Sequence, residues 1–147
     1  MSPGSPLILA SGSPRRRQWF QALRIPFDVQ LPDVDETQLP GEDPADMVAR
    51  LAALKAGTVA ERHPGRWVVA ADTTVAVDHH TLNKPADAGD AARMLGLIQG
   101  RDHQVHTGFC LKRDGESHAF VDTARVFLRP MTGACIHWYV ATGEPMD

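Results

Sequence analysis

The chain alternates short apolar runs with stretches of helical periodicity. Residues 7–10 and 67–71 are unbroken apolar runs, which are typical of buried strands. Residues 27–31 alternate apolar and polar positions and predict a half-buried strand. A strand pattern resumes at residues 75–77 after the polar step Asp72-Thr73-Thr74, which we expect to interrupt it. The first half of the chain therefore predicts strands separated by helices.

Two further strands are expected in the second half. Residues 105–112 and 119–128 have a strand pattern, and the Arg113-Asp114-Gly115-Glu116 segment between them is a hairpin signal. A hairpin pairs its strands antiparallel, whereas strands connected through a helix usually pair in parallel. We therefore predict an α/β fold in which helices flank a mixed sheet.

Helices are predicted between these strands, at residues 15–23, after Asp43, at residues 87–97 and after Thr132. Asp43 and Thr132 are typical capping residues, and Pro44 suits a first helical position. The second helix is expected to end near His63-Pro64-Gly65 and the third at Gly100. The core candidates recur at helical spacing: Trp19, Phe20 and Leu23; Met47, Val48, Leu51 and Leu54; Met94, Leu95 and Ile98; Ile136, Tyr139 and Val140.

The composition indicates one globular domain spanning residues 1–147, with 43% hydrophobic and 22% charged residues. The net charge of −3 argues against a non-specific nucleic-acid binder, although a locally basic pocket can still hold one anionic ligand. Cys110 and Cys135 are too few for a zinc site or a disulfide framework, and we interpret them as core thiols. With no membrane-spanning or signal-peptide pattern, we expect a cytoplasmic protein.

The polar residues that follow the first strand point to an anionic ligand. The apolar run ends at Ser11-Gly12-Ser13-Pro14, and Arg15, Arg16 and Arg17 come next. A helix N-terminus carries partial positive charge, and guanidinium groups bind phosphate oxygens with two hydrogen bonds. A solvated first turn is the alternative, but three cations there are unfavourable without an anion. We therefore predict that Arg15 and Arg16 bind phosphate and that Arg17 faces water.

Asp72 is the second candidate, because Asp is a poor strand former and is rarely buried without a partner. It either caps a turn at the end of a strand or points into a ligand site, and its spacing does not separate these alternatives. In a ligand site it would hold a divalent cation or deprotonate a water molecule. A neighbouring Lys84 would keep the carboxylate ionised.

Other residues favour ordinary structural roles when each is considered alone. Lys55 is expected on a solvated helix face and Glu36 in an acidic loop, while His79-His80 marks an exposed turn. The P-loop pattern, the Gly-x-Gly-x-x-Gly pattern and the Gly-x-Ser-x-Gly pattern are all missing from the sequence. The aromatic residues expected in the core, rather than as platforms for bases, are Trp19, Phe20, Trp138 and Tyr139.

A series of short motifs nevertheless runs through the chain in a fixed order. The motifs are residues 9–16, Asp35-Glu36, Leu51-Ala52 with Lys55-Ala56, Ala71-Asp72-Thr73, Lys84-Pro85, and Gly100-Arg101 with His103, Val105, Thr107 and Gly108. In order and spacing they resemble the Maf family of nucleoside triphosphate pyrophosphatases, also called septum formation inhibitor proteins. Each motif is weak alone, and the ordered series across nearly the whole chain is specific.

The resemblance implies an elongated mixed sheet, like that of inosine triphosphate pyrophosphatases, and metal-assisted hydrolysis of unwanted nucleoside triphosphates to monophosphate and pyrophosphate. It implies that Asp72 is the proton acceptor and that Glu36 is a further active-site carboxylate. From their charge we expect Asp72 and Glu36 to hold Mg²⁺ or Mn²⁺. Arg15 and Thr73 match positions linked to base choice, and this pair resembles the subgroup that acts on dTTP and UTP. The positions that match substrate-binding residues are Ser11, Arg15, Arg16, Glu36, Lys55, Thr73 and Lys84.

Members of the family continue beyond the segment that matches residues 143–147, with a further strand, a terminal helix and a Gln counted among the specificity positions. The C-terminally truncated domain is therefore either a fragment or a shortened member with an open cleft. Loss of a strand would expose a sheet edge and part of the core, which favours instability or self-association as a homodimer. The leading hypothesis is a pyrimidine-nucleotide pyrophosphatase that binds its substrate and neither nucleic acid nor membrane. A nucleotide-binding protein without turnover and a regulatory interaction module are the alternatives.

Overall fold

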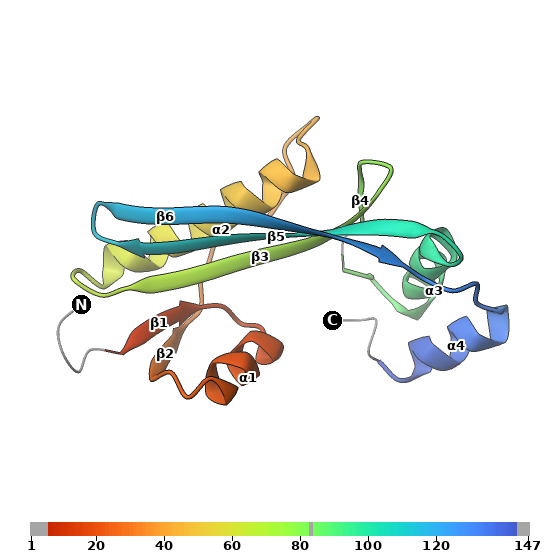
Figure 1. The fold of residues 1–147 in the computed structure, drawn as a ribbon, viewed down its shortest axis with the longest axis horizontal. Coiled ribbons are helices and arrows are strands. Elements are labelled where there is room, and N and C mark those ends of the chain that lie inside the picture. Colours follow the sequence, from red (N-terminus) through yellow and green to blue (C-terminus); the bar gives the residue numbers. More distant parts are fainter. Residues whose placement is uncertain (1–5, 83, 144–147) are drawn as a thin grey trace. The chain divides into compact units, whose positions relative to one another are not determined.

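The computed structural model describes residues 6–82 and 84–143, and its strands and helices are drawn in Figure 1. Most predicted elements are confirmed, with bounds that shift by a few residues. In chain order they are β1 (Leu7–Ala10), α1 (Pro14–Ala22), β2 (Phe27–Gln30), α2 (Pro44–Arg62), β3 (Val68–Val77), β4 (His80–Leu82), α3 (Ala88–Ile98), β5 (Asp102–Arg113), β6 (Glu116–Phe127) and α4 (Gly133–Ala141).

The strands of the described residues form one mixed sheet, as predicted. Its order is β2-β1-β3-β5-β6, and β4 pairs with β3. β1 is parallel to both of its neighbours, with Ile8 opposite Val68 on β3. β4 is antiparallel to β3. The turn between them contains Asp78 and His79, whose positive φ values of 50° and 67° suit a two-residue hairpin.

One predicted break in the sheet is wrong. Asp72, Thr73 and Thr74 do not interrupt a strand, because β3 runs without a break from Val68 to Val77. Thr is a good strand former, and Asp72 is tolerated in the strand because its carboxylate has a buried partner, Lys55.

The fold divides into two compact units. The first comprises residues 1–73 and 107–122, and the second comprises residues 74–106 and 123–147. β1, β2, α1 and α2 belong to the first unit, whereas β4, α3 and α4 belong to the second. The strands β3, β5 and β6 contribute residues to both.

The core of the first unit lies between α2 and the sheet. α2 begins as predicted, with Pro44 in its first turn and the Asp43 carboxylate accepting the Ala45 N–H at 2.9 Å. Small side chains dominate its buried face and let the helix lie close to the strands. The cluster consists of Ala52, Ala56, Val59 and Ala60 of α2 with Ile8, Ala10, Val68, Ala70 and Cys110 of the strands.

Two core predictions for the first unit are wrong. Leu54 is exposed, because the buried stripe of α2 runs through Ala52, Lys55, Ala56 and Val59 instead. α1 buries no side chain at all, and Trp19 is 57% exposed. α1 contacts β2, which is the edge strand of the sheet.

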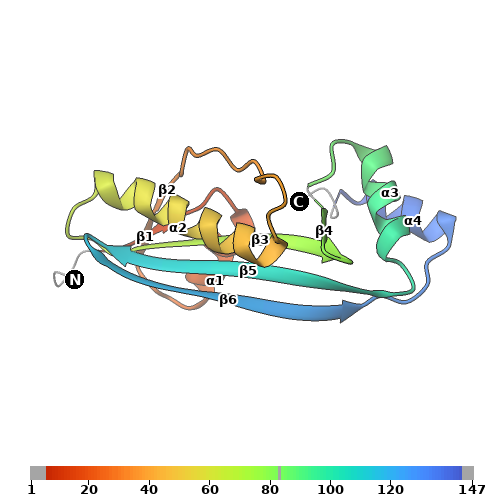
Figure 2. The same ribbon diagram turned by 90° about the horizontal axis from the view of Figure 1, so that it is seen from above.

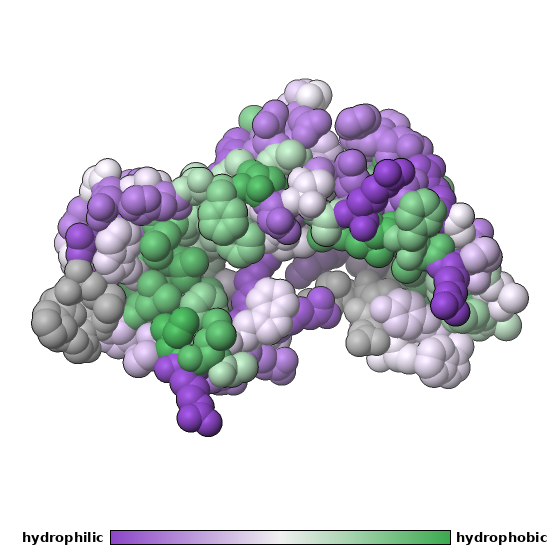
Figure 3. Space-filling model, viewed as in Figure 1, coloured by the Kyte–Doolittle hydropathy of each residue, from purple (hydrophilic) through white to green (hydrophobic). Residues whose placement is uncertain are grey.

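The prediction for α1 holds in part. Phe20 packs against Phe27 of β2, with ring centroids 5.7 Å apart. Leu23, the other member of the predicted face, lies just after the helix and is exposed. Figure 3 shows such exposed apolar side chains as green patches among hydrophilic ones.

The second unit has its own core between α3 and α4. Caps at Asp87 and Thr132 start these helices, and the second of them is the cap predicted from the sequence. Trp138 and Cys135 are exposed, which corrects the prediction of core positions for both. Trp138 lies two positions from Ile136 and from Val140, on the opposite side of α4. The core residues are Ala91, Leu95 and Val140, with Ala92, Ile98, Ile136 and Tyr139 packed around them.

Within residues 6–82 and 84–143, no helix is both long enough and apolar enough to cross a membrane.

Gly108 of β5 is a point of close approach between the sheet and α2. A Cβ atom at this position would meet the carbonyl group of Val48, with the carbonyl carbon only 2.5 Å away. Because that atom belongs to the backbone of a packed helix, Gly108→Ala is expected to lower the free energy of unfolding by about 2 kcal/mol. Urea unfolding of the two proteins measures this difference.

Gly96→Ala is the matched control for this substitution. Gly96 lies in α3, and no atom lies within 4 Å of a Cβ built there. Alanine is the better helix former, so this variant is expected to gain about 0.5–1 kcal/mol. Equal stability of Gly108→Ala and the unsubstituted protein would contradict the close approach of α2.

Candidate functional site

The path of the chain around β1 favours a ligand site beyond the carboxyl end of β1, beside the middle of β3. From β1 the chain passes through α1 to β2 on one side, and from β2 through α2 to β3 on the other side. Such crossovers between parallel strands are right-handed, so α1 and α2 cover opposite faces of the sheet. Figure 2 agrees, with α2 on the near side and α1 behind. Ligands of open α/β sheets bind where successive crossovers diverge in this way.

Ser11, the first residue after β1, organises the start of α1. It is buried, and its Oγ accepts hydrogen bonds from the Ser13 N–H at 3.1 Å and from Arg16 Nη1 at 3.4 Å. Ser13 caps α1 and accepts the Arg16 N–H at 3.4 Å. The guanidinium group of Arg16 then reaches β3, where its Nη2 donates to Thr73 Oγ1 at 3.1 Å. The loop, the helix cap and the strand together hold Arg16.

Thr107 of β5 extends this group of polar side chains. Its Oγ1 lies 3.2 Å from Thr73 Oγ1, within hydrogen-bond distance. The sequence assigned no role to Thr107, although Thr107 belongs to the last motif of the ordered series. The sequence signal that could have found it is its place in that motif, directly before Gly108.

Asp72 points to the opposite face of β3 from Thr73, since side chains alternate along a strand. On that face α2 places Lys55 Nζ 2.9 Å from Asp72 Oδ1. The same ammonium group lies 2.7 Å from Glu36 Oε1, which comes from the loop between β2 and α2. The side chains of Lys55 and Asp72 are only 10% and 12% exposed, whereas that of Glu36 is 58% exposed. A buried cation therefore joins two carboxylates, one of which is open to solvent.

The interpretation of these three residues from sequence alone needs two corrections. Lys55 does not lie on a solvated helix face, because Asp72 and Glu36 hold its ammonium group against the sheet. Asp72 does not cap a turn at a strand end, because it lies in the middle of β3. The cation that contacts Asp72 within the first unit is Lys55. Lys84 belongs to the second unit, and its place beside Asp72 stays a prediction.

The first unit thus brings six of the predicted site residues to the carboxyl end of β1 and the neighbouring middle part of β3. Ser11, Arg16 and Thr73 lie together on one side of β3, and Glu36, Lys55 and Asp72 lie together on the other. β1 pairs with β3 at Ile8 and Leu9 and ends at Ala10. If this register continues, Ser11 lies beside Ala71, and the edge of β3 at Asp72 and Thr73 is free of β1.

Arg15 and Lys84 are the remaining predicted cations of the site. Arg15 is exposed on the first turn of α1, and so is Arg17, as expected for a side chain that faces water. Lys84 belongs to the second unit, where it lines a cavity of about 670 Å³. The approach of both cations to a bound triphosphate stays a prediction.

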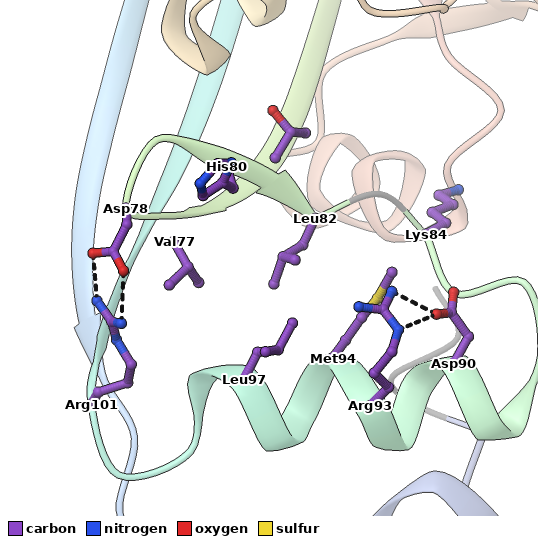
Figure 4. A pocket seen from close by; sticks show the side chains of 11 residues that line it. Val77, Asp78, His80, Leu82, Lys84, Asp90, Arg93, Met94, Leu97 and Arg101 are labelled. Carbon is purple, nitrogen blue, oxygen red and sulfur yellow. Dashed lines mark hydrogen bonds and ion pairs between the residues drawn. The ribbon is translucent and has the colours of Figure 1, made fainter.

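The cavity beside Lys84 has a mixed lining, in which apolar side chains lie between two ion pairs (Figure 4). Arg101 makes two hydrogen bonds to the Asp78 carboxylate, at 2.8 and 2.9 Å. These contacts hold the pKa of Asp78 below its usual range, mainly through the hydrogen bonds from Arg101. The apolar lining residues are Val77, Leu82, Met94 and Leu97.

The carboxylates of the first unit suit a metal ion that also binds phosphate. Mg²⁺ is commonly held by one or two carboxylates together with substrate phosphates. Asp72 and Glu36 each direct one oxygen to the same ammonium group, which shows that both reach a common point. The described part of the chain contains no group of three His, Cys, Asp or Glu residues that could hold a metal ion. A cation here would therefore need further donors from a ligand.

Comparison with known proteins identifies the family. Residues 6–147 match the family described as Maf-like protein. The chain belongs to the Maf family. Its relatives include proteins named dTTP/UTP pyrophosphatase from Symbiobacterium thermophilum and Myxococcus xanthus, both 48% identical over 141 residues. The matches cover 96% of this chain and 73% and 71% of those relatives. A protein of the same name from Geobacter metallireducens is 45% identical, and the match covers 100% of this chain and 78% of that protein.

Solved structures confirm the predicted fold class. The Ham1 protein of Staphylococcus aureus has a TM-score of 0.57 at 18% identity, covering 82% of this chain and 70% of that one. A Vibrio cholerae protein has a TM-score of 0.50 at 12% identity, covering 94% of this chain and 77% of that one. At these identities the likeness shows the α/β fold alone.

The stability of the first unit is expected to depend on Lys55. Lys55→Met would leave the carboxylates of Asp72 and Glu36 facing each other without a cation, one of them buried. Removing one partner of a buried ion pair is strongly destabilising, so we expect a loss of about 3 kcal/mol in the free energy of unfolding. Urea unfolding measures it.

Lys112→Met is the control, because it removes a partly buried lysine from β5 of the same unit. Its expected effect is within about 0.5 kcal/mol. If both variants unfold at the same urea concentration as the unsubstituted protein, Lys55 does not bridge the two carboxylates.

Proposed function

We propose that this protein hydrolyses dTTP and UTP to the nucleoside monophosphate and pyrophosphate. The observation that carries the proposal is the buried Lys55 ammonium held between Asp72 and Glu36, next to the group that contains Arg16. Membership of the Maf family supports it, as do the names of the relatives. Removal of unwanted pyrimidine nucleotides from the cellular pool is the role that this activity would serve.

The cations of the site suit a triphosphate. Arg16 and Lys55 would bind phosphate oxygens, with Ser11 supplying a buried hydroxyl, and Lys84 and Arg15 would complete the set. Negative charge grows on the pyrophosphate as it leaves, so cations fixed in advance stabilise the transition state more than the ground state. Arg16 is fixed in this way by Ser11 and Thr73.

Asp72 is the proposed proton acceptor. A water molecule would attack the α-phosphorus, Asp72 would accept its proton, and the bond from the α-phosphorus to the bridging oxygen would break to release pyrophosphate. Asp72 and Glu36 would also hold a Mg²⁺ or Mn²⁺ ion, which when bound supplies charge neutralisation on the phosphate oxygens. Arg15 and Thr73 are exposed and would contact the base.

We do not favour a nucleotide-binding protein without turnover. The carboxylate that hydrolysis requires is present, and it lies beside a cation suited to phosphate. A regulatory interaction module would need a docking surface independent of these residues, and no observation nominates its partner.

Asp72→Asn separates turnover from binding. The substitution keeps the shape and the hydrogen-bond acceptor for Lys55 but removes the base, so hydrolysis of dTTP is expected to fall by about 10²–10⁴-fold while dTTP binding is retained. Pyrophosphate release and equilibrium binding measure the two quantities. Asp114→Asn is the control, because Asp114 lies in the β5–β6 turn and accepts the Gly65 N–H.

The same assay tests the substrate when it is run with dTTP, UTP, CTP, GTP and 7-methyl-GTP. Release of pyrophosphate from dTTP and UTP is expected. No release from any nucleotide would reject the proposed function, and release from 7-methyl-GTP alone would overturn the proposed choice of base.

Removal of divalent cations tests the metal. Hydrolysis is expected to fall to background in a chelator and to return with Mg²⁺ or Mn²⁺. Since Glu36 would be a ligand, Glu36→Gln is expected to raise the Mg²⁺ concentration for half-maximal rate by at least about tenfold. Glu61→Gln is the control, because Glu61 is exposed near the end of α2, and it should leave this Mg²⁺ concentration unchanged. Equal Mg²⁺ dependence of both variants would exclude Glu36 as a ligand.

A further inference from the structure

Arg50 of α2 donates three hydrogen bonds to the loop that precedes the helix. Its Nη2 donates to the Thr37 carbonyl oxygen at 3.1 Å. Its Nε and Nη2 also donate to the two carboxylate oxygens of Glu42, at 2.7 and 2.9 Å. The Glu42 side chain is only 9% exposed. A single guanidinium group therefore holds both the middle and the end of this loop.

The loop is closed on itself around these contacts. The Thr37 N–H and hydroxyl both donate to Asp35 Oδ1, at 2.9 and 2.6 Å. The Leu39 N–H donates to Glu42 Oε1 at 3.2 Å, and Gln38 Nε2 donates to the Glu42 carbonyl oxygen at 2.9 Å. The residues on both sides of Glu36 are thus fixed by hydrogen bonds that lead back to Arg50.

The charges favour this arrangement at neutral pH. Hydrogen bonds from Arg50 hold the pKa of Glu42 below its usual range, so the Glu42 carboxylate stays ionised and keeps accepting these bonds. Lysine could not replace Arg50, because a single ammonium group does not present two parallel donors and a third contact.

The position of the Glu36 carboxylate depends on the backbone conformation of the loop. Its side chain is long and exposed, and the contact that holds its carboxylate within the described residues is the one to Lys55 at 2.7 Å. A free Glu side chain already samples many rotamers. If the backbone were mobile as well, the carboxylate would be spread over several ångströms. Arg50 and Lys55 lie on the same helix, so α2 anchors the loop and also carries the cation that Glu36 meets.

We propose that Arg50 is a positioning residue, which fixes the 35–42 loop and thereby holds the Glu36 carboxylate beside Lys55 and Asp72. The effect of Arg50 on the reaction passes through Glu36 and involves no contact with the nucleotide. The functional part of this inference rests on the proposed hydrolysis, whereas the structural part does not.

Hydrogen exchange tests the structural part without any assay of activity. In Arg50→Met, backbone amides of residues 37–42 are expected to exchange faster than in the unsubstituted protein, because Arg50 no longer restrains the loop. Arg62→Met is the matched control, since it removes the same charge from an exposed position in the last turn of the same helix. If the amides of residues 37–42 exchange at the same rate in Arg50→Met and Arg62→Met, the proposal is wrong.

A second variant keeps the test decisive if Arg50→Met fails to fold. Arg50→Lys retains the charge and can retain one hydrogen bond, so it is expected to fold and to show a smaller increase in exchange in the same segment. No increase in Arg50→Lys or Arg50→Met would mean that the loop holds its conformation without the guanidinium group.

A double-substitution cycle tests the functional part. Arg50→Met is expected to lower kcat/KM for dTTP by about 10–100-fold, as misplacement of a site residue does, and to raise the Mg²⁺ requirement as Glu36→Gln does. If Arg50 acts through Glu36, adding Arg50→Met to Glu36→Gln causes no further loss. A multiplicative loss in the double variant would mean that Arg50 acts independently of Glu36, and the proposal would be wrong.

The two proposals can fail separately. If the unsubstituted protein releases no pyrophosphate, the proposed function fails, and the same four proteins are then compared by their affinity for dTTP with Mg²⁺. Faster exchange in Arg50→Met, with non-additive losses of affinity, would still establish Arg50 as the residue that positions Glu36. Additive losses of affinity would reject it.

Discussion

The Lys55 ammonium group, held between Asp72 and Glu36, is the interaction on which the site depends. A buried charge is costly unless partners of opposite sign compensate it, so the three side chains must come together when the first unit folds. Each comes from a different element: α2, β3 and the loop between β2 and α2. The packing of α2 on the sheet therefore builds the site and the core in one step.

The close packing of α2 follows from side-chain size. Its buried face carries alanines at positions 52, 56 and 60, and Gly108 of β5 leaves room for the backbone at Val48. Larger side chains would move the helix outwards, and Lys55 would lose contact with Asp72. The hydroxyl groups and the Arg16 guanidinium group on the other face of β3 are held in a different way, by the capped N-terminus of α1 that follows Ser11. The close packing of α2 and the capped start of α1 thus place their side chains on the two faces of β3, at Asp72 and Thr73.

Much of the fold could be predicted because its signals are local. The caps at Asp43 and Thr132 and the turn at Asp114 depend on the conformations of a few neighbouring residues, and all were found where the sequence placed them. Burial was predicted less well. Trp19 and Trp138 are apolar but exposed, because periodicity shows which residues share a helix face and does not show whether anything covers that face.

The sequence by itself determined the order of the elements, the mixed character of the sheet and the set of motifs that places the chain in its family. Only the tertiary structure decided that the partner of Asp72 is Lys55, that Glu36 joins them and that Thr107 meets Thr73. Lys55 and Asp72 are 17 residues apart in the sequence, and their contact requires a particular helix face to pack on a particular strand. Local signals cannot specify such a contact, because it depends on strand order and helix packing across the whole unit.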